Sequence, residues 1–300
     1  MKIRNYEFDF KNKTYICGIL NVTPDSFSDG GRNVQIDIAL ENARRMIFDG
    51  ASIIDVGGES TRPGYTPVDE KEELRRVIPF IEALRSQSDI PISVDTSKAA
   101  VAKAALEAGA DIINDVSGLI ADPRMAATVK EADAYCIIMH NSHYVNQLKS
   151  LKDEDIRLAN ADDTNNDDQD YVNQNSVERS YVNQLCSEME ALVQRALEAG
   201  IDKDKILLDP GVGFKGSVEK DHIVLNNLPA FSQTGFPILL GASRKSCIAA
   251  VCGGNIRERE AGTLAVSTLA TLAGVAVLRV HNVRDNACAV RLTEEICRYE

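Results

Sequence analysis

The chain has 300 residues, 44% of them hydrophobic, which is enough to bury a sizeable core in two ordinary domains or one large α/β unit. Its net charge of −12 gives a nucleic-acid partner no electrostatic support. No run of about 18 apolar residues predicts a membrane span or membrane partner, residues 1–15 lack the apolar centre of a signal peptide, and seven scattered cysteines are typical of reduced thiols in the cytoplasm.

Eight short apolar runs recur along the chain, and each ends at a polar residue. The first covers residues 15–20, ends at Asn21 and continues into a loop rich in Thr, Pro, Asp, Ser and Gly. The later runs end, in chain order, at Asp55, Asp95, Asn114, His140, Asp209, Ser243 and Arg279. Continuous apolar strands are typical of a parallel sheet that is buried on both faces.

Helical periodicity separates these predicted strands, with apolar residues on one face of each segment. Gly50, Gly109 and Gly200 end three of the helices. The predicted helices cover residues 36–48, 70–86, 99–108, 123–131, 178–198, 218–228, 260–273 and 283–297.

The regular pattern lapses after the fifth strand. Residues 160–175 contain ten Asn or Asp in sixteen positions, and Tyr-Val-Asn-Gln begins at Tyr144, Tyr171 and Tyr181. A repeat this short and irregular is not a solenoid unit. We therefore expect residues 141–176 to form a low-complexity polar surface insertion between strand 5 and helix 5, with partner binding as the alternative.

Eight strand–helix units predict a (β/α)8 TIM barrel, a single α/β domain over residues 1–300. No Gly-x-Gly-x-x-Gly follows the first strand, which argues against a dinucleotide-binding sheet. In a barrel the carboxyl ends of all strands meet at one mouth. The acceptors and cations expected there are Asn21, Asp95, Asn114, Asp209, Lys245, Arg279 and His281.

This set of side chains suits a particular kind of ligand. Carboxylates and an amide match the donor edge of a fused nitrogen heterocycle, and the cations match an anion such as phosphate. Asn21 with nearby carboxylates suits Mg²⁺, which prefers oxygen ligands. Four histidines without metal-ligand spacing do not favour zinc, and no Cys–His pair suggests a nucleophile.

Each residue also has a purely structural interpretation. An Asp at a strand end often caps the next helix, and Asp95 before Thr96 fits that role. His140 suits a structural hydrogen-bonding group, and Asp115, Asp122 and Asp133 suit caps or solvated charges. Seven suitable residues from six strand ends nevertheless favour a shared binding site.

Seven motifs, in this order, resemble the signatures of the dihydropteroate synthase family. They are Gly18 to Gly31, Asp55 to Gly64, Ser93-Val94-Asp95-Thr96, Ile113-Asn114-Asp115, Leu208-Asp209-Pro210-Gly211, Ser243-Arg244-Lys245-Ser246 and Arg279-Val280-His281. The resemblance covers about residues 15–298 apart from the insertion. It implies that the chain joins 6-hydroxymethyl-7,8-dihydropterin pyrophosphate to p-aminobenzoate, giving 7,8-dihydropteroate and pyrophosphate in folate biosynthesis.

The resemblance also implies roles for individual residues. The implied pterin-binding residues are Asp95, Asn114, Val116, Met139, Asp209, Gly213, Phe214, Lys245 and Arg279. The implied p-aminobenzoate-binding residues are Phe27, Thr61, Arg62, Pro63, Lys245 and Ser246. The implied pyrophosphate-binding residues are Asn21, Thr61, Arg279 and His281, with Mg²⁺ at Asn21. The implied catalytic residues are Asp95, Lys245, Arg279 and His281.

The family's reaction is SN1-like, and the residues agree with it. An aryl amine is a weak nucleophile, and no candidate general base lies near its expected position. In such a route pyrophosphate leaves first with the help of Mg²⁺ and cations, and Asp95 stabilises the positive charge on the pterin. The resemblance further implies inhibition by sulfonamides and a homodimer, with residues 263–273 as one candidate surface.

Three details depart from the family pattern. Lys215-Gly216 reverses the common Gly-Lys after Phe214, Asn141 to Tyr144 replace a small or Pro-containing turn, and Asn282 replaces an Asp. Two alternatives share the pterin residues: a methyltetrahydrofolate–corrinoid methyltransferase-like barrel and a non-catalytic pterin-binding paralogue. From the sequence we also expect deletion of residues 144–176 to leave activity largely unchanged.

Overall fold

The computed structural model describes residues 1–22, 32–59, 68–157 and 174–298. Within these ranges, eight parallel strands form one sheet in the order β8-β7-β6-β5-β4-β3-β10-β9. A parallel bridge between Leu208 and Ile238 joins its two ends, so the sheet closes. The predicted barrel is therefore confirmed. The strands are β3 (Tyr15–Asn21), β4 (Ile53–Gly57), β5 (Ile92–Asp95), β6 (Ile112–Asp115), β7 (Tyr135–Met139), β8 (Ile206–Asp209), β9 (Leu239–Leu240) and β10 (Val277–Val280).

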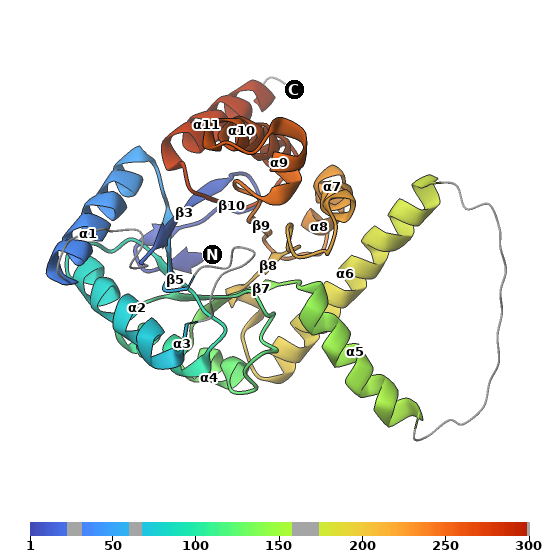
Figure 1. The fold of residues 1–300 in the computed structure, drawn as a ribbon, viewed down its shortest axis with the longest axis horizontal. Coiled ribbons are helices and arrows are strands. Elements are labelled where there is room, and N and C mark those ends of the chain that lie inside the picture. The colour runs from blue at the N-terminus through green and yellow to red at the C-terminus, as the bar shows by residue number, and fades with distance from the viewer. Residues whose placement is uncertain (23–31, 60–67, 158–173, 299–300) are drawn as a thin grey trace.

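Helices surround this sheet, as Figure 1 shows. They are α1 (Arg32–Asp49), α2 (Glu70–Arg85), α3 (Ala99–Glu107), α4 (Met125–Glu131), α5 (Ser142–Arg157), α6 (Gln174–Glu198), α7 (Val218–Asn226), α8 (Leu228–Ser232), α9 (Ser246–Cys252), α10 (Ile256–Leu272) and α11 (Val283–Cys297). None of the helices in the described ranges is long and apolar enough to cross a membrane.

Local sequence explains where several helices begin. Asp69 accepts a hydrogen bond from the Glu72 amide at 2.7 Å and caps α2. Asn255 and Glu258 form a reciprocal capping box at α10. The predicted helix over 218–228 is two helices, because Asn227 ends the first and Pro229 lies in the first turn of the second.

Alternate apolar residues of the strands pack into two separate clusters. One set faces the helices, and the other fills the barrel interior. The interior set includes Cys17, Ile53, Ile112, Ile137, Leu207, Leu239, Ala276 and Val277. Ile3 and Phe8 belong to this set and close the amino end of the barrel. Ile3 belongs to a small hairpin of β1 (Lys2–Ile3) and β2 (Tyr6–Glu7), and Phe8 directly follows this hairpin. The hairpin was not predicted from the sequence.

The structure corrects the boundaries expected for the insertion. Residues 142–157 form α5, and α6 begins at residue 174 rather than 178. Val145 is 6% exposed and belongs to the core, and Leu148 packs against it. The interpretation of residues 141–157 as irregular was therefore wrong. The rest of the expected insertion, residues 158–173, lies outside the described ranges. Figure 1 shows α5 and α6 extending away from the barrel.

Deleting residues 144–176 is consequently expected to lower the free energy of unfolding by at least about 2 kcal/mol, because the deletion removes Val145 from the core. Replacing residues 158–173 with a Gly-Ser segment of equal length keeps α5 and α6, and should leave stability close to that of the original chain. Urea denaturation of both variants measures the difference. Equal stability of the two would contradict the role given to α5.

Candidate functional site

Polar side chains line the carboxyl end of the barrel because they continue the interior parity of the strands. Two residues beyond Cys17 is Ile19, and two further is Asn21; the same step leads from Ile53 to Asp55. By this parity, the residues that face the mouth are Asn21, Asp55, Asp95, Asn114, Met139, Asp209, Gly241 and Arg279. Six of the residues predicted for the site therefore converge on one opening.

Arg279 joins two carboxylates across the mouth. Its Nε donates to Asp55 Oδ2 at 2.6 Å, and its Nη2 donates to Asp95 Oδ2 at 2.6 Å. Asn114 Nδ2 lies 3.5 Å from the same Asp55 oxygen. Asp55 is fully buried, and its Oδ1 has no hydrogen-bond partner among the described residues. The Arg279 guanidinium thus lies between two buried carboxylates, and Asp55 Oδ1 remains as an acceptor without a donor among the described residues.

Burial and charge act in opposite directions on this group. Burial raises the pKa of Asp95 to about 7, against the attraction of Arg279 and with the repulsion of Asp55. Burial alone would lower the pKa of Arg279, but the charges of Asp55 and Asp95 outweigh it and raise that pKa. Arg279 therefore stays charged. Because the pKa of Asp95 is about 7, a change in the charges near it can add or remove its proton.

The capping interpretation of Asp95 is wrong. Thr96 Oγ1 accepts from the Lys98 amide at 3.2 Å, and Asp122 accepts from the Ala99 amide at 3.0 Å. Asp95 is thereby left to Arg279. Asp122 does act as a cap, as the sequence suggested.

Lys245 lies over the ring of Phe214, with Nζ 4.6 Å from the ring centroid, and donates to the Val212 carbonyl. Burial lowers the pKa of Lys245, while the charge of Asp209 opposes that shift. Asp209 accepts from the Gly211 amide at 2.7 Å. This brings a cation, a carboxylate and an aromatic face together on the β8–β9 side of the mouth.

Gly213 makes this approach of Lys245 possible. Its φ of +87° favours glycine, and a Cβ there would lie 2.6 Å from Lys245 Cδ. Its amide donates to Asp221 Oδ1 on α7 at 2.7 Å. Any larger residue at position 213 would displace the lysine.

The remaining predicted residues occupy the same rim. His281 Nδ1 lies 3.0 Å from Ser243 Oγ, and Ser246 is the exposed first residue of α9. Met139 is buried at the end of β7, and the Val116 carbonyl accepts from Asn141 Nδ2 at 3.2 Å. Phe27, Thr61, Arg62 and Pro63 lie outside the described residues.

Gly58 and Glu59, which precede Thr61 to Pro63 in the sequence, are held by ion pairs and hydrogen bonds. Lys98 Nζ lies 2.6 Å from Glu59 Oε2 and 2.6 Å from Glu73 Oε2. Arg76 donates to the Gly58 carbonyl at 2.9 Å. The chain that leaves β4 toward Thr61 therefore begins from a fixed position.

Sequence reasoning missed two features of the site. Asp55 was placed at a strand end but given no binding role, although its interior parity was a usable signal. Lys215 and His140 form a buried contact with Glu188 beside Asp209. Nothing in their sequence spacing indicates this cluster, because its members lie on different elements.

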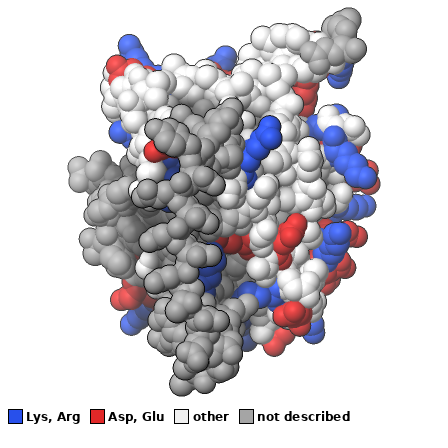
Figure 2. All heavy atoms as spheres, turned by 90° about the vertical axis from the view of Figure 1, so that its right-hand side faces the viewer, with Lys and Arg blue, Asp and Glu red and all other residues white. Residues whose placement is uncertain are grey.

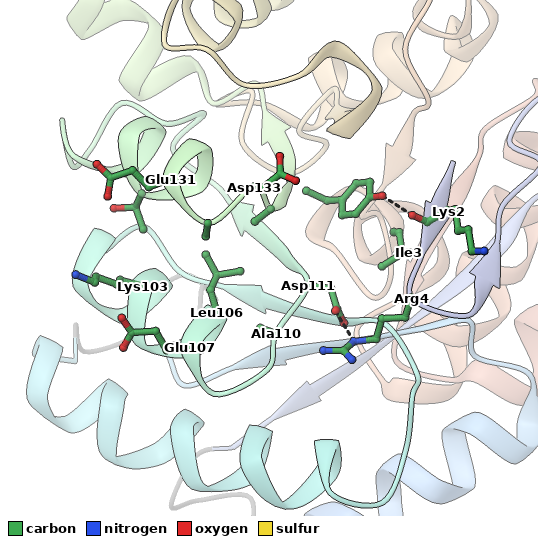
Figure 3. Close-up of a pocket in the computed structure, with 14 residues that line it drawn as sticks. Lys2, Ile3, Arg4, Lys103, Leu106, Glu107, Ala110, Asp111, Glu131 and Asp133 are labelled. Carbon is green, nitrogen blue, oxygen red and sulfur yellow. Dashed lines mark hydrogen bonds and ion pairs between the residues drawn. The ribbon is translucent and has the colours of Figure 1, made fainter.

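A hollow of about 510 Å³ lies at the opposite, amino end of the barrel (Figure 3). Several of its polar groups are already paired: Arg4 with Asp111 at 2.5 Å, and the Tyr135 hydroxyl with the Lys2 carbonyl. The carboxyl ends of the strands do not reach it. We therefore place the functional site at the mouth.

Charges on the face shown in Figure 2 are mixed, with basic and acidic side chains interspersed. The described residues of that face form no basic stripe of the kind that binds nucleic acid.

Known proteins resemble this chain over nearly its whole length. Residues 17–281 match the pterin binding enzyme family. A dihydropteroate synthase of Clostridium beijerinckii is 40% identical over 299 residues, which cover 99% of this chain and 100% of that protein. A solved dihydropteroate synthase from Clostridium difficile, in the presence of pteroic acid, has 43% identity and a TM-score of 0.81, covering 97% and 100% of the two chains. One from Xanthomonas albilineans with 4-aminobenzoic acid has 36% identity and a TM-score of 0.79, covering 95% and 94%.

Proposed function

Since the chain belongs to the pterin-binding enzyme family, we propose that it acts as a dihydropteroate synthase. It joins 6-hydroxymethyl-7,8-dihydropterin pyrophosphate to p-aminobenzoate and releases 7,8-dihydropteroate and pyrophosphate. The family resemblance inferred from the sequence motifs is confirmed. The substrates are small molecules, as in the related structures with pteroic acid and 4-aminobenzoic acid.

One observation carries this proposal: the side chains of Asp95, Asn114, Asp209 and Lys245 lie together at the carboxyl end of the barrel. Carboxylate and amide oxygens suit the N–H groups of a pterin, and the ammonium of Lys245 suits its carbonyl oxygen. Phe214 and Met139 supply apolar surface beside them. Such a slot orients a flat heterocycle with its side chain toward Arg279 and His281.

The residues also support a dissociative reaction. Arg279 and His281 would attract the pyrophosphate and stabilise its negative charge as it leaves. Asp95 in its ionised form would stabilise the positive charge that spreads over the pterin. Arg279 contributes twice, because it also favours the ionised form of Asp95.

Mg²⁺ is the cofactor that we propose, held through Asn21. A Cβ at Gly57 would lie 3.1 Å from Asn21 Oδ1, so glycine keeps space open beside this oxygen. The described residues contain no group of three or more His, Cys, Asp or Glu that could hold a metal. One amide oxygen fits Mg²⁺, which commonly keeps several waters and binds substrate phosphates. When bound, the ion would neutralise charge on the leaving pyrophosphate.

Incubating the purified chain with both substrates and Mg²⁺, and detecting 7,8-dihydropteroate by mass, tests the proposal. Formation of dihydropteroate and pyrophosphate in equal amounts supports it. Pterin binding without product would indicate a non-catalytic pterin-binding protein. Methyl transfer from methyltetrahydrofolate to a corrinoid would indicate the methyltransferase alternative.

Replacing Phe27 with alanine is expected to raise KM for p-aminobenzoate at least about tenfold while changing pterin affinity by less than about twofold. The reason is the family resemblance, which places this aromatic side chain at the second substrate. Steady-state kinetics and pterin titration measure the two effects. Equal effects on both substrates would count against this role. Inhibition by sulfonamides, as p-aminobenzoate mimics, stays a prediction of the same kind.

We also propose that the chain forms a homodimer through α10 and α11, which pack side by side. Large apolar side chains are exposed on and beside these helices: Val251, Ile256, Leu269, Leu272, Leu292 and Ile296. An exposed patch of this kind is typical of a protein interface. It includes the carboxyl-terminal part of the surface expected from the sequence, residues 263–273.

Replacing Leu269 and Leu292 together with aspartate is expected to shift the sedimenting species from twice the chain mass of 32.8 kDa to that mass, because charges would face each other in an apolar interface. Phe48, which is 90% exposed on α1, offers a matched control as Phe48→Asp. A monomeric original chain, or a control that dissociates equally, would contradict this surface.

A cytoplasmic location is likewise proposed, supported by seven free thiols.

A further inference from the structure

Lys215 is a buried lysine that the proposed reaction does not use. It follows Phe214 in the segment between β8 and α7 and is 3% exposed. Its Nζ contacts His140 Nδ1 and donates to the His140 carbonyl oxygen at 3.0 Å. A buried ammonium is costly unless its donors are satisfied, so these contacts define its place.

His140 passes this contact on to a carboxylate. Its Nε2 lies 2.5 Å from Glu188 Oε2 on α6. Because an ammonium can only donate, His140 Nδ1 must accept, and Nε2 must carry the proton that goes to Glu188. Burial lowers the pKa of His140, in keeping with this neutral ring. Lys149 Nζ and Gln184 Nε2 donate to the other carboxylate oxygen, Glu188 Oε1, at 2.5 and 2.7 Å.

This chain of contacts is attached to the site on both sides. The His140 amide donates to the Asp209 carbonyl at 2.8 Å, which aligns the ends of β7 and β8. Gly211, which donates to the Asp209 carboxylate, has a φ of +74°, and a Cβ there would collide with the His140 carbonyl. Phe214, three residues after Gly211, carries Lys245 over its ring, and Gly213 leaves room for that lysine.

We propose that Lys215 is a positioning residue: through His140 and Glu188 it holds residues 210–217, and with them Asp209 and Lys245, in the geometry that binds the pterin. The proposal deepens the proposed function and rests on it for the identity of the ligand. It also accounts for the reversed Lys215-Gly216 pair, in which the lysine directly follows Phe214.

Charges around Lys215 come from every neighbouring element: His140 at the end of β7, Glu188 on α6, Asp209 on β8, Asp221 on α7 and Lys245 before α9. Burial lowers the pKa of Lys215 to about 7, against the attraction of the three carboxylates and with the repulsion of Lys245. Burial raises the pKa of Asp209, and Lys215 is among the cations that oppose this.

The sign of the pH effect follows from that opposition. Pterin binding uses the ionised form of Asp209, so affinity falls as pH drops through the pKa of that carboxyl group. Lys215 is charged below about pH 7 and favours the ionised form of Asp209 there, against the effect of burial. Without Lys215, Asp209 retains its proton to higher pH, and the acid limb of pterin affinity moves upward.

The test is a fluorescence titration of the intact protein with 6-hydroxymethylpterin, over a pH range of about 1.5 units on either side of neutrality. It compares the original chain with Lys215→Met, Glu188→Gln and the control Lys220→Met. Lys220 is an exposed lysine on α7, five positions away. We expect Lys215→Met to weaken binding at least about tenfold at the acid end and less at the alkaline end. Glu188→Gln should act in the same direction and more weakly, and Lys220→Met should follow the original chain.

Unchanged affinity in a folded Lys215→Met protein overturns the proposal, and so does a loss whose size is the same at every pH. If Lys215→Met does not fold, Glu188→Gln decides, and an acid limb that stays in place there overturns it too. Product formation by the original chain is measured separately. A chain that makes no dihydropteroate but shows the shifted acid limb would sink the proposed function while leaving the role of Lys215 intact.

Discussion

Replacing Arg279 with methionine is expected to lower the free energy of unfolding by about 3–5 kcal/mol and to reduce dihydropteroate formation by about 100- to 1000-fold. The stability loss follows from Asp55 and Asp95, two buried carboxyl groups that would both lose the guanidinium that pairs with them. The rate loss follows from the leaving pyrophosphate, which would lose a donor, and from Asp95, whose ionised form would lose its nearest support.

Two further variants separate these effects. Arg298→Met removes an exposed pair with Glu295 and should change stability by no more than about 1 kcal/mol. Adding Asp55→Asn to Arg279→Met should restore part of the lost stability, because an amide replaces a buried carboxyl group that has lost its partner. It should not restore the rate. Urea denaturation and initial rates measure both quantities. A stable Arg279→Met protein would mean that the two carboxylates are not held by this cation.

Replacing Lys245 with alanine is expected to weaken pterin binding and to lower kcat/KM by about 100-fold or more, with little loss of stability. Burial already lowers the pKa of Lys245, so the folded protein gains little from its charge. The pterin would lose a donor, and Asp209 would lose the cation that most opposes the rise of its pKa.

Lys103→Ala is the matched control for this variant, because Lys103 is an exposed lysine that lines the hollow at the amino end of the barrel. We expect it to leave pterin binding and rate unchanged. Pterin titration and steady-state kinetics compare the two variants. A larger effect from Lys103→Ala than from Lys245→Ala would move the site to the other end of the barrel.

The alternation of the strands explains why much of the site could be predicted. A polar residue at the end of an apolar strand, two positions beyond an interior residue, faces the mouth whatever its distance along the chain. Asn114 and Asp209 follow this rule from the sequence alone. The pairing of Asp55 with Arg279 could not be predicted, since the two are 224 positions apart and the sequence does not show which charges meet.

Composition hid other parts of the fold. The run of Asn and Asp in residues 160–175 suggested irregular structure throughout the insertion, whereas Val145 and Leu148, three positions apart, carry a helical signal before it begins. The contact of Lys215 with His140 depends on a left-handed turn at Gly211, a backbone feature that no side-chain pattern announces. Long-range charge pairs and turn geometry therefore had to come from the structure.

A structure of the chain bound to 6-hydroxymethylpterin tests the central claim most directly. We predict that the pterin lies in the mouth, with Asp209 and Asn114 on its N–H groups and Lys245 on its oxygen. A pterin bound instead in the hollow between the β1–β2 hairpin, α3 and α4, with the mouth empty, would contradict the account.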